Sequence, residues 1–222
     1  MTTLGRVKEQ CFACGETCQY ESILSTNRRG WADLDTRPPG MARSTIVLSI
    51  QRCPYCGYCA PKVSRFSERA SETIRSEKYL HQLKDQRYPR LANSFLCWAI
   101  IREEVGSYAE GGWAAIHAAW ICDDWKPESA ASCRNRAIEL FQNAKAKGDS
   151  FAQDVGVEEA ILADLFRRSG QFDEVKPVCE AGLSKKPKEV TEHVLVYQIA
   201  LAARQDTGCH TIGQAVEYAE GS

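Results

Sequence analysis

Two short cysteine motifs near the start of the chain restrict its possible folds more than any other sequence feature. Residues 11–15 read Cys-Phe-Ala-Cys-Gly and residues 53–57 read Cys-Pro-Tyr-Cys-Gly. The glycine after each second cysteine tolerates the positive φ of a tight turn, so backbone N–H groups can point at the sulfur atoms. Four thiolates complete a tetrahedral zinc site with Zn–S distances of about 2.3 Å and no open position. The motifs therefore predict one structural Zn²⁺ per chain, held by Cys11, Cys14, Cys53 and Cys56.

The segment between the motifs carries the signals of short strands and turns. Residues 19–25 and 44–51 are predicted strands, the second rich in β-branched residues, and residues 27–30 and 37–40 are predicted turns. A β-module of about 60 residues buries too little apolar surface to be stable alone, and a bound metal contributes about 10–16 kcal/mol. We therefore expect a zinc-ribbon-like metal-binding domain over residues 1–62.

The remaining cysteines fall into two groups. Cys18 and Cys59 lie close to the motifs in the sequence, and three roles are open for them: buried spectators, members of an alternative ligand set, or thiols that respond to oxidants. The chain has 11 cysteines, an odd number, and its first ten residues lack the apolar core of a signal peptide, which argues against a disulfide framework. The other five are expected to be small buried residues on helix faces: Cys97, Cys122, Cys133, Cys179 and Cys209.

Apolar patterning and charge limit the location and the partners of the protein. The longest apolar stretches, residues 95–101 and 113–122, fall short of the roughly 20 residues that span a bilayer. We therefore expect a cytoplasmic protein without a membrane-spanning segment. Residues 1–91 carry 15 Lys and Arg against 9 Asp and Glu, whereas residues 92–222 carry 13 against 20. The basic and acidic parts can attract each other, face different partners, or form ordinary solvated surface.

The pattern after Pro61 is helical almost to the end of the chain, because apolar residues recur with a period near 3.6 instead of two. Short breaks at Gly and Pro separate the helices. The predicted helices cover roughly residues 64–87, 90–105, 108–125, 128–147, 151–169, 172–184, 190–205 and 211–220.

Two stretches share one pattern at matching offsets. Residues 161–174 place small Ala163 and large Phe166 on one helix, followed by a Gly-x-aromatic turn, and residues 98–118 contain the same kind of turn. This pattern is typical of the tetratricopeptide repeat, a helix-turn-helix unit of about 34 residues. The helix expected at residues 128–147 belongs to neither unit. The sequence therefore predicts an α+β, mostly α, protein with a tetratricopeptide-like array of antiparallel helical hairpins over residues 63–222.

Taken together, the two cysteine motifs, the Asp-Leu-Asp-Thr-Arg-Pro-Pro stretch at residues 33–39 and the helical tail resemble a bacterial family. The family is catalogued as a domain of unknown function, number twenty-two twenty-five. The resemblance implies a zinc-binding head joined to tetratricopeptide-like helices, and it leaves the activity open. It also draws attention to two polar segments, residues 33–39 and 206–210, to which the sequence assigns no role.

The function expected from these features is that of an adaptor or scaffold. Stacked hairpins bury their apolar faces and leave polar residues on exposed faces for a protein partner. Helical spacing selects four candidates for such contacts: Asn93, Arg102, Glu159 and Arg167.

Other functions are also compatible with a zinc-ribbon head. Nucleic-acid binding is the first alternative, through Arg28, Arg29, Arg37 and Arg43. A rubredoxin-like or thiol-based redox protein is the second. Catalysis is not expected, because the sequence contains no Gly-rich phosphate loop, His-Glu-x-x-His motif or nucleophile elbow. Cys209 and His210 are adjacent, and adjacent side chains point apart.

Overall fold

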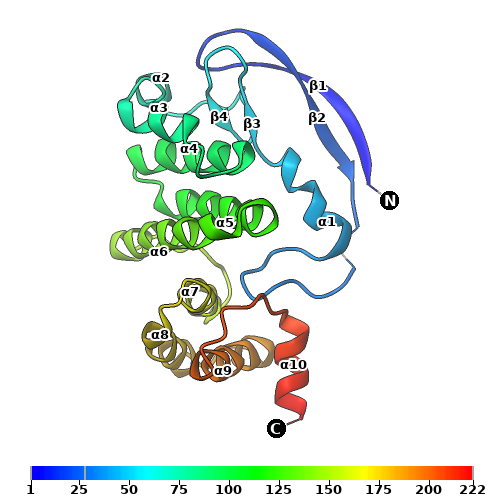
Figure 1. The fold of residues 1–222 in the computed structure, drawn as a ribbon, viewed down its shortest axis with the longest axis vertical. Helices are drawn as coiled ribbons and strands as arrows, with labels where there is room; N and C mark the ends of the chain where they lie inside the picture. Colours follow the sequence, from blue (N-terminus) through cyan, green and yellow to red (C-terminus); the bar gives the residue numbers. More distant parts are fainter. Residues whose placement is uncertain (1, 28, 222) are drawn as a thin grey trace. The chain divides into compact units, whose positions relative to one another are not determined.

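The computed structural model describes residues 2–27 and 29–221, and most of them are helical (Figure 1). The chain forms two compact units. The N-terminal unit comprises Met1–Arg28 and Gly40–Asn143, and the C-terminal unit comprises Arg29–Pro39 and Ala144–Ser222. The expected boundary between residues 62 and 63 marks the change from strands to helices and stays a prediction, because the compact units follow a different division.

The strands of the N-terminal unit form two small antiparallel hairpins. Strands β1 (Thr3–Gln10) and β2 (Thr17–Ser25) pair with each other and bracket the first cysteine motif. Strands β3 (Gln51–Arg52) and β4 (Cys59–Ala60) bracket the second motif. Each hairpin thus brings the two ends of one motif together, as a zinc-ribbon-like head requires.

The predicted strand at residues 44–51 is wrong over most of its length. Helix α1 (Gly40–Ser44) and the 3₁₀ helix η1 (Thr45–Leu48) occupy it instead. The hydroxyls of Ser44 and Thr45 donate to backbone carbonyls three residues earlier, at 2.8 and 2.7 Å. Such local bonds favour a helical turn, and they outweigh the β-propensity of the branched residues here.

The predicted helices are confirmed almost throughout the rest of the chain. Two segments differ. The predicted helix at residues 64–87 is not helical at 64–69 and 85–87, and it is broken before Glu77 because Ser76 is extended there and its Oγ caps the next helix by accepting from the N–H of Tyr79. The predicted helix at residues 151–169 begins only at Val157. Besides α1 and η1, the helices of the N-terminal unit are α2 (Ala70–Thr73), α3 (Glu77–Lys84), α4 (Arg90–Glu104), α5 (Tyr108–Trp125), η2 (Pro127–Ser129) and most of α6 (Ala130–Lys147).

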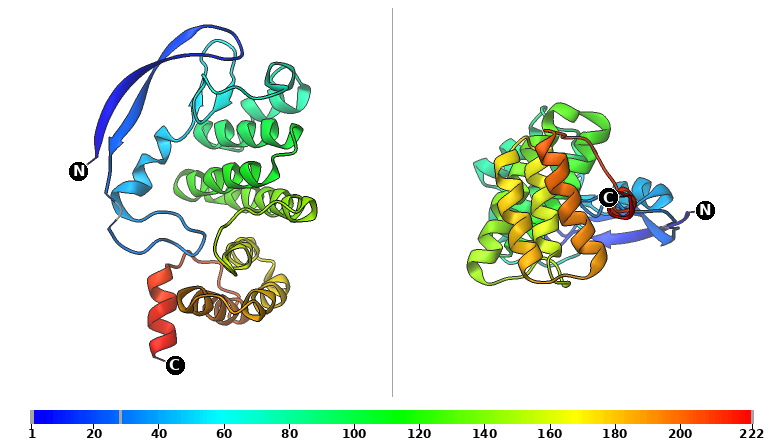
Figure 2. Two further views of the ribbon diagram at one scale, coloured as in Figure 1. Left: turned by 180° about the vertical axis from the view of Figure 1, so that it is seen from behind. Right: turned by 90° about the horizontal axis from the view of Figure 1, so that it is seen from below.

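Helical hairpins organise the C-terminal unit as well. Its helices are α7 (Val157–Arg168), α8 (Phe172–Ser184), α9 (Glu189–Ala203) and α10 (Ile212–Glu220). A turn with Gly170 at φ 76° joins α7 to α8. Helix α9 packs against both members of this hairpin, so α7, α8 and α9 lie side by side (Figure 2). The predicted packing of helical hairpins is confirmed for these helices, and the tetratricopeptide repeat itself stays a prediction.

Residues 29–39 belong to the C-terminal unit although they lie between two segments of the N-terminal unit in the sequence. The N–H of Leu34 donates to the carbonyl of His210, and the N–H of Ile212 donates to the carbonyl of Ala32, at 2.9 and 2.8 Å. Leu34 is buried. The two polar segments to which the sequence assigns no role are therefore each other's structural partners.

Among the described residues, no helix combines the length and the apolar character that crossing a bilayer requires. The cores of both units consist mainly of aliphatic and aromatic side chains from the helices. Burial of those side chains is the main stabilising contribution to each unit.

Two neighbouring glycines of α5 yield a matched stability test. A Cβ at Gly112 would overlap the ring of buried Phe141, so Gly112→Ala should destabilise the fold by about 1–3 kcal/mol. A Cβ at Gly111 would meet Leu140 Cδ1 at an ordinary 3.4 Å, so Gly111→Ala should stabilise by up to about 1 kcal/mol through helix propensity. Chemical denaturation of both variants measures the difference, and equal effects would contradict the close α5–α6 contact.

Candidate functional site

Four cysteine thiols converge in the N-terminal unit. The sulfur atoms of Cys11, Cys14, Cys53 and Cys56 all lie within 4.8 Å of one another. The Sγ atoms of Cys11 and Cys56 are 3.7 Å apart, and those of Cys14 and Cys53 are also 3.7 Å apart. A tetrahedral ion with metal–sulfur bonds of about 2.3 Å requires sulfur atoms about 3.8 Å apart, whereas a disulfide requires about 2.0 Å. The group therefore fits a tetrahedral metal ion.

The two motifs adopt the same local structure, which we call the first and the second knuckle. In the first, the N–H of Gly15 donates to the carbonyl of Cys11 at 2.8 Å. In the second, the N–H of Gly57 donates to the carbonyl of Cys53 at 3.0 Å. Both glycines have positive φ, 78° and 79°, as the sequence pattern predicts. A side chain at either position would strain the turn that presents the thiols.

Burial and backbone N–H groups act in opposite directions on these thiols. Burial raises the pKa of Cys11 to about 11, although N–H groups within its own knuckle lower it in part. Burial also acts to raise the pKa of Cys53, but the N–H groups of Cys56 and Tyr55 outweigh it and lower the value to about 7. A metal ligand must be a thiolate, so the second knuckle contributes one that forms readily near neutral pH.

Cys18 and Cys59 lie outside the four-thiol group, among the part of the chain that the structure describes. Both are buried. The thiol of Cys59 donates to the carbonyl of Gly57 at 3.3 Å. Burial agrees with a role in packing, but Cys18 also interacts with the thiols of Cys53 and Cys14, so the three roles left open by the sequence stay open.

The second knuckle packs directly against α3. The hydroxyl of Tyr79 donates to the carbonyl of Gly57 at 3.0 Å and accepts from the N–H of Cys59 at 3.1 Å. Leu83, one turn further along α3, approaches Gly57 so closely that a Cβ there would lie 2.7 Å from its Cδ2. The position of α3 is thus coupled to the geometry of the four-thiol group.

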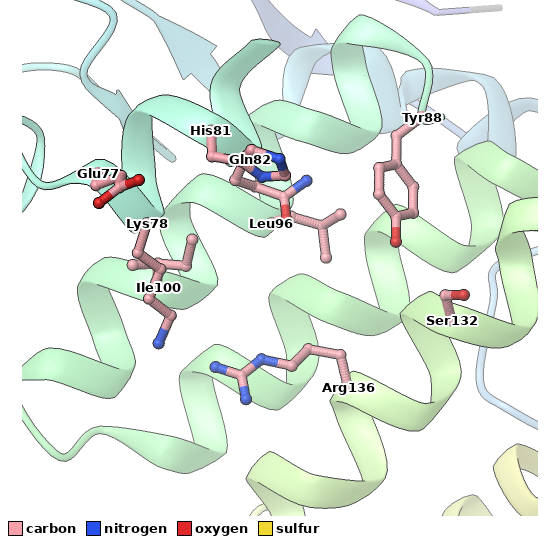
Figure 3. A pocket seen from close by; sticks show the side chains of 9 residues that line it. All are labelled: Glu77, Lys78, His81, Gln82, Tyr88, Leu96, Ile100, Ser132 and Arg136. Carbon is pink, nitrogen blue, oxygen red and sulfur yellow. The ribbon is translucent and has the colours of Figure 1, made fainter. Parts of the chain in front are cut away.

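A cavity of about 550 Å³ lies where α3, α4 and α6 meet (Figure 3). Helix α4 contributes the floor, and the other two helices and the loop before α4 contribute the walls. The lining residues of the floor are Leu96 and Ile100, and those of the walls are Glu77, Lys78, His81, Gln82, Tyr88, Ser132 and Arg136.

One end of the cavity carries a cluster of charges. Lys78 and Arg136 both contact Oε2 of Glu103 at 2.5 Å. Burial alone would raise the pKa of Glu103, but the two cations reverse this effect and hold the pKa below its ordinary value. Glu103 is therefore ionised at neutral pH and fixes both cations beside the cavity.

The four candidate partner-binding residues were expected on exposed helix faces, and this expectation is wrong. Asn93, Glu159 and Arg167 are buried. The side chain of Arg102 is 14% exposed and contacts Glu110 at 2.9 Å. Helical spacing alone cannot identify the exposed face, because helices inside an array are covered on more than one side.

These residues have structural contacts instead. Asn93 accepts from Nε2 of Gln82 at 2.8 Å and thereby orients a residue that lines the cavity. Oε1 of Glu159 accepts hydrogen bonds from Nζ of Lys145 and from Nζ of Lys185, at 2.8 and 3.0 Å.

Arg167, with a relative exposure of 0%, is the centre of a polar network in the C-terminal unit. Its guanidinium donates to Asp164 and Gln198, both at 2.7 Å. It also donates to the carbonyls of Asp206 and Gly208, at 2.6 and 2.9 Å. The polar segment 206–210 is therefore held by a buried charge from α7.

The arginines that the sequence suggests for nucleic-acid contact differ in burial: Arg29 is exposed and Arg43 is partly exposed. Arg37 is buried in the C-terminal unit, and Arg28 lies outside the described residues.

His210 does not pair with its neighbour Cys209: its two ring nitrogens contact Asp206 at 2.9 Å and Tyr197 at 3.3 Å. Cys209 is exposed in a loop, not buried on a helix face as the sequence predicts; partial desolvation and the nearby Asp33 and Asp35 raise the pKa of its thiol to about 12, which disfavours a thiolate.

In comparisons with known proteins, no family model, no curated protein and no solved structure matches this chain. The function proposed for the protein therefore rests on the geometry of its own residues.

Loss of the metal should loosen the head and α3 but spare the C-terminal unit. In Cys53→Ser, which removes one of four ligands, we expect the metal content to fall from about one ion per chain toward zero, because a closed site needs all its thiolates. Hydrogen exchange should accelerate at both knuckles and in α3, and stay unchanged in α7–α9. Cys179→Ser, at a buried cysteine outside the group, is the control for loss of a thiol. Metal retention in Cys53→Ser would exclude the assigned site.

Removal of the buried guanidinium should destabilise the C-terminal unit strongly. Arg167→Met leaves Asp164 buried without its cation, which typically costs about 3–5 kcal/mol. The double variant Arg167→Met with Asp164→Leu should recover part of this loss. Lys176→Met, at a side chain 69% exposed, should change the stability by less than about 0.5 kcal/mol. An unchanged unfolding midpoint for Arg167→Met would show that the polar network around Arg167 does not stabilise the C-terminal unit.

Proposed function

We propose that this protein is a zinc-binding adaptor whose helical part holds a segment of a protein partner. The observation that carries the proposal is the cavity of α3, α4 and α6. Its volume of about 550 Å³ is within the usual range of ligand sites, about 300–1,000 Å³. Only Leu96 and Ile100 among its lining residues are aliphatic, so the cavity is more polar than small-molecule sites usually are.

The packing of the helices supports a protein partner rather than a small metabolite. Stacked helical hairpins present extended concave surfaces, and proteins with this architecture use them to hold peptides or partner surfaces. The cavity is formed by three helices, α3, α4 and α6, so a partner segment that crosses it can contact each of them.

The metal has a structural role in this proposal. Four thiolates without an open position suit zinc as a structural ion, with no reaction at the metal itself. The second knuckle holds α3 through Tyr79 and Leu83, and α3 contributes Lys78, His81 and Gln82 to the cavity. We infer that zinc keeps one wall of the partner site in place.

The remaining expectations belong to the same proposal. Membership of the bacterial family rests on the resemblance of the cysteine motifs and residues 33–39. A cytoplasmic location and the lack of catalytic activity go with an adaptor whose thiols stay reduced.

Site-specific crosslinking tests the adaptor function. A photoreactive benzoylphenylalanine replaces His81, which is exposed at the cavity, or Leu24 of β2, which is 67% exposed and serves as the control. In lysate of the native host, we expect one protein to be crosslinked from position 81 and not from position 24. Mass spectrometry identifies it, and removal of zinc with a chelator should abolish the crosslink because α3 loses its support.

Two outcomes would contradict the proposal. Crosslinking of nucleic acid from position 81 would favour the alternative function. Equal capture of proteins from positions 81 and 24 would show that the cavity does not bind a specific protein partner.

A further inference from the structure

A fifth thiol lies beside the four-thiol group. Strand pairing places Cys18 of β2 directly opposite Glu9 of β1. The pairing continues beyond the two strands, because the N–H of Cys11 donates to the carbonyl of Glu16 at 2.8 Å. Side chains two positions apart along a strand point to the same face, so Cys18 and Cys11 share one face of the hairpin.

That face is turned toward the second knuckle. Tyr20, two residues after Cys18, donates from its hydroxyl to the carbonyl of Arg52 at 3.3 Å, and Arg52 directly precedes Cys53 in the sequence. The thiol of Cys18 lies close enough to interact with the thiols of Cys53 and Cys14. Cys18 is only 8% exposed, so it is held between the first hairpin and the second knuckle rather than in solvent.

The four thiols of the group differ in exposure. Cys11 and Cys53 are buried and Cys56 is partly buried, whereas Cys14 is exposed. An exposed thiolate is the one that a proton or a competing reagent reaches first. Loss of Cys14 from the group leaves three thiolates, whereas structural zinc sites are almost always closed by four ligands.

We propose that Cys18 is a reserve ligand, which takes the place of Cys14 when that thiolate leaves the metal. One metal–sulfur bond breaks at Cys14 and one forms at Cys18, while the thiol of Cys18 gives up one proton and Cys14 takes up one. Four thiolates surround the ion before and after the exchange, so no oxidant or reductant takes part. This inference rests on the proposed zinc site and adds a fifth thiol to it.

Replacement of Cys14 is the exchange that the geometry favours. Rotation about χ1 between staggered positions moves a cysteine sulfur by about 3 Å, so Cys18 can approach the ion without a change in the backbone. The second knuckle then keeps both of its thiols, Cys53 and Cys56, and the first hairpin supplies Cys11 and Cys18. Replacement of Cys53 would instead leave the second knuckle with one ligand, so the metal loss expected for Cys53→Ser still holds.

Serine variants of the full zinc-loaded chain test the exchange. In competition with a chromogenic chelator, Cys14→Ser should keep about one zinc ion per chain, because Cys18 supplies the fourth thiolate. The double variant Cys14→Ser with Cys18→Ser should lose its zinc at an about tenfold lower chelator concentration, since only three thiolates remain. Cys18→Ser alone should bind zinc like the unchanged chain. The matched control is Cys14→Ser with Cys59→Ser, which removes another buried thiol and should keep its zinc.

Cobalt(II) in place of zinc counts the thiolates independently of affinity. The sulfur-to-cobalt charge-transfer absorption of Cys14→Ser should equal that of the unchanged chain. In the double variant it should fall to about three quarters, because one of four thiolates is missing.

Two results would overturn the inference. Loss of zinc from Cys14→Ser as readily as from the double variant would show that Cys18 does not replace the missing ligand. Zinc held as tightly by the double variant as by Cys14→Ser would show that another group fills the fourth position. In both cases the unchanged chain still holds zinc, whereas an unchanged chain without zinc would refute the proposed metal itself, so the two failures are distinguishable.

Discussion

Packing of the second knuckle against α3 is the contact on which the N-terminal unit depends. The knuckle needs glycine at position 57 twice over: for its positive φ and because Leu83 leaves no room for a Cβ. Tyr79 adds two hydrogen bonds to the backbone of the same turn. Four thiols that meet within 4.8 Å can hold an ion that makes the turn rigid. Tyr79 and Leu83 contact this turn directly, so a rigid turn also holds α3 in place.

The C-terminal unit depends on a buried charge instead of a metal. Arg167 is fully buried, so its charge is tolerated only because Asp164, Gln198 and two backbone carbonyls receive its N–H groups. The carbonyls belong to the same polar segment that pairs with residues 29–39. The buried arginine thereby orders the surface on which an N-terminal stretch of the chain is held.

The proposed adaptor function connects the metal centre to recognition through α3. One face of this helix contacts the knuckle through Tyr79 and Leu83, and another presents Lys78, His81 and Gln82 to the cavity. A helix can serve both purposes because residues three or four positions apart share a face, while those between them point elsewhere. A zinc ion with no open coordination position would then influence partner binding by positioning a wall of the site.

Much of the local structure is readable from the sequence. The spacing of Cys11, Cys14, Cys53 and Cys56 identified the thiols that converge, because a metal knuckle is encoded within five consecutive residues. Helix periodicity located most helices for the same reason. Local reasoning failed at residues 44–51, where hydroxyl-to-carbonyl bonds favoured a helical turn over β-propensity.

Contacts between distant residues were decided only by the tertiary structure. Nη1 of Arg168 donates to Oδ2 of Asp35 at 3.3 Å, although 133 positions separate the two residues. No sequence pattern around either residue predicts this pair. Exposure of Arg167 was likewise misjudged, because a helix in an array has neighbours on several sides that its own periodicity does not record. The cavity of α3, α4 and α6 also exists only once the helices are packed. The sequence by itself thus determined which thiols meet and where most helices form, because those depend on interactions within a few residues. Tertiary packing decided which charges are buried and where the cavity forms, because those depend on elements brought together from far along the chain.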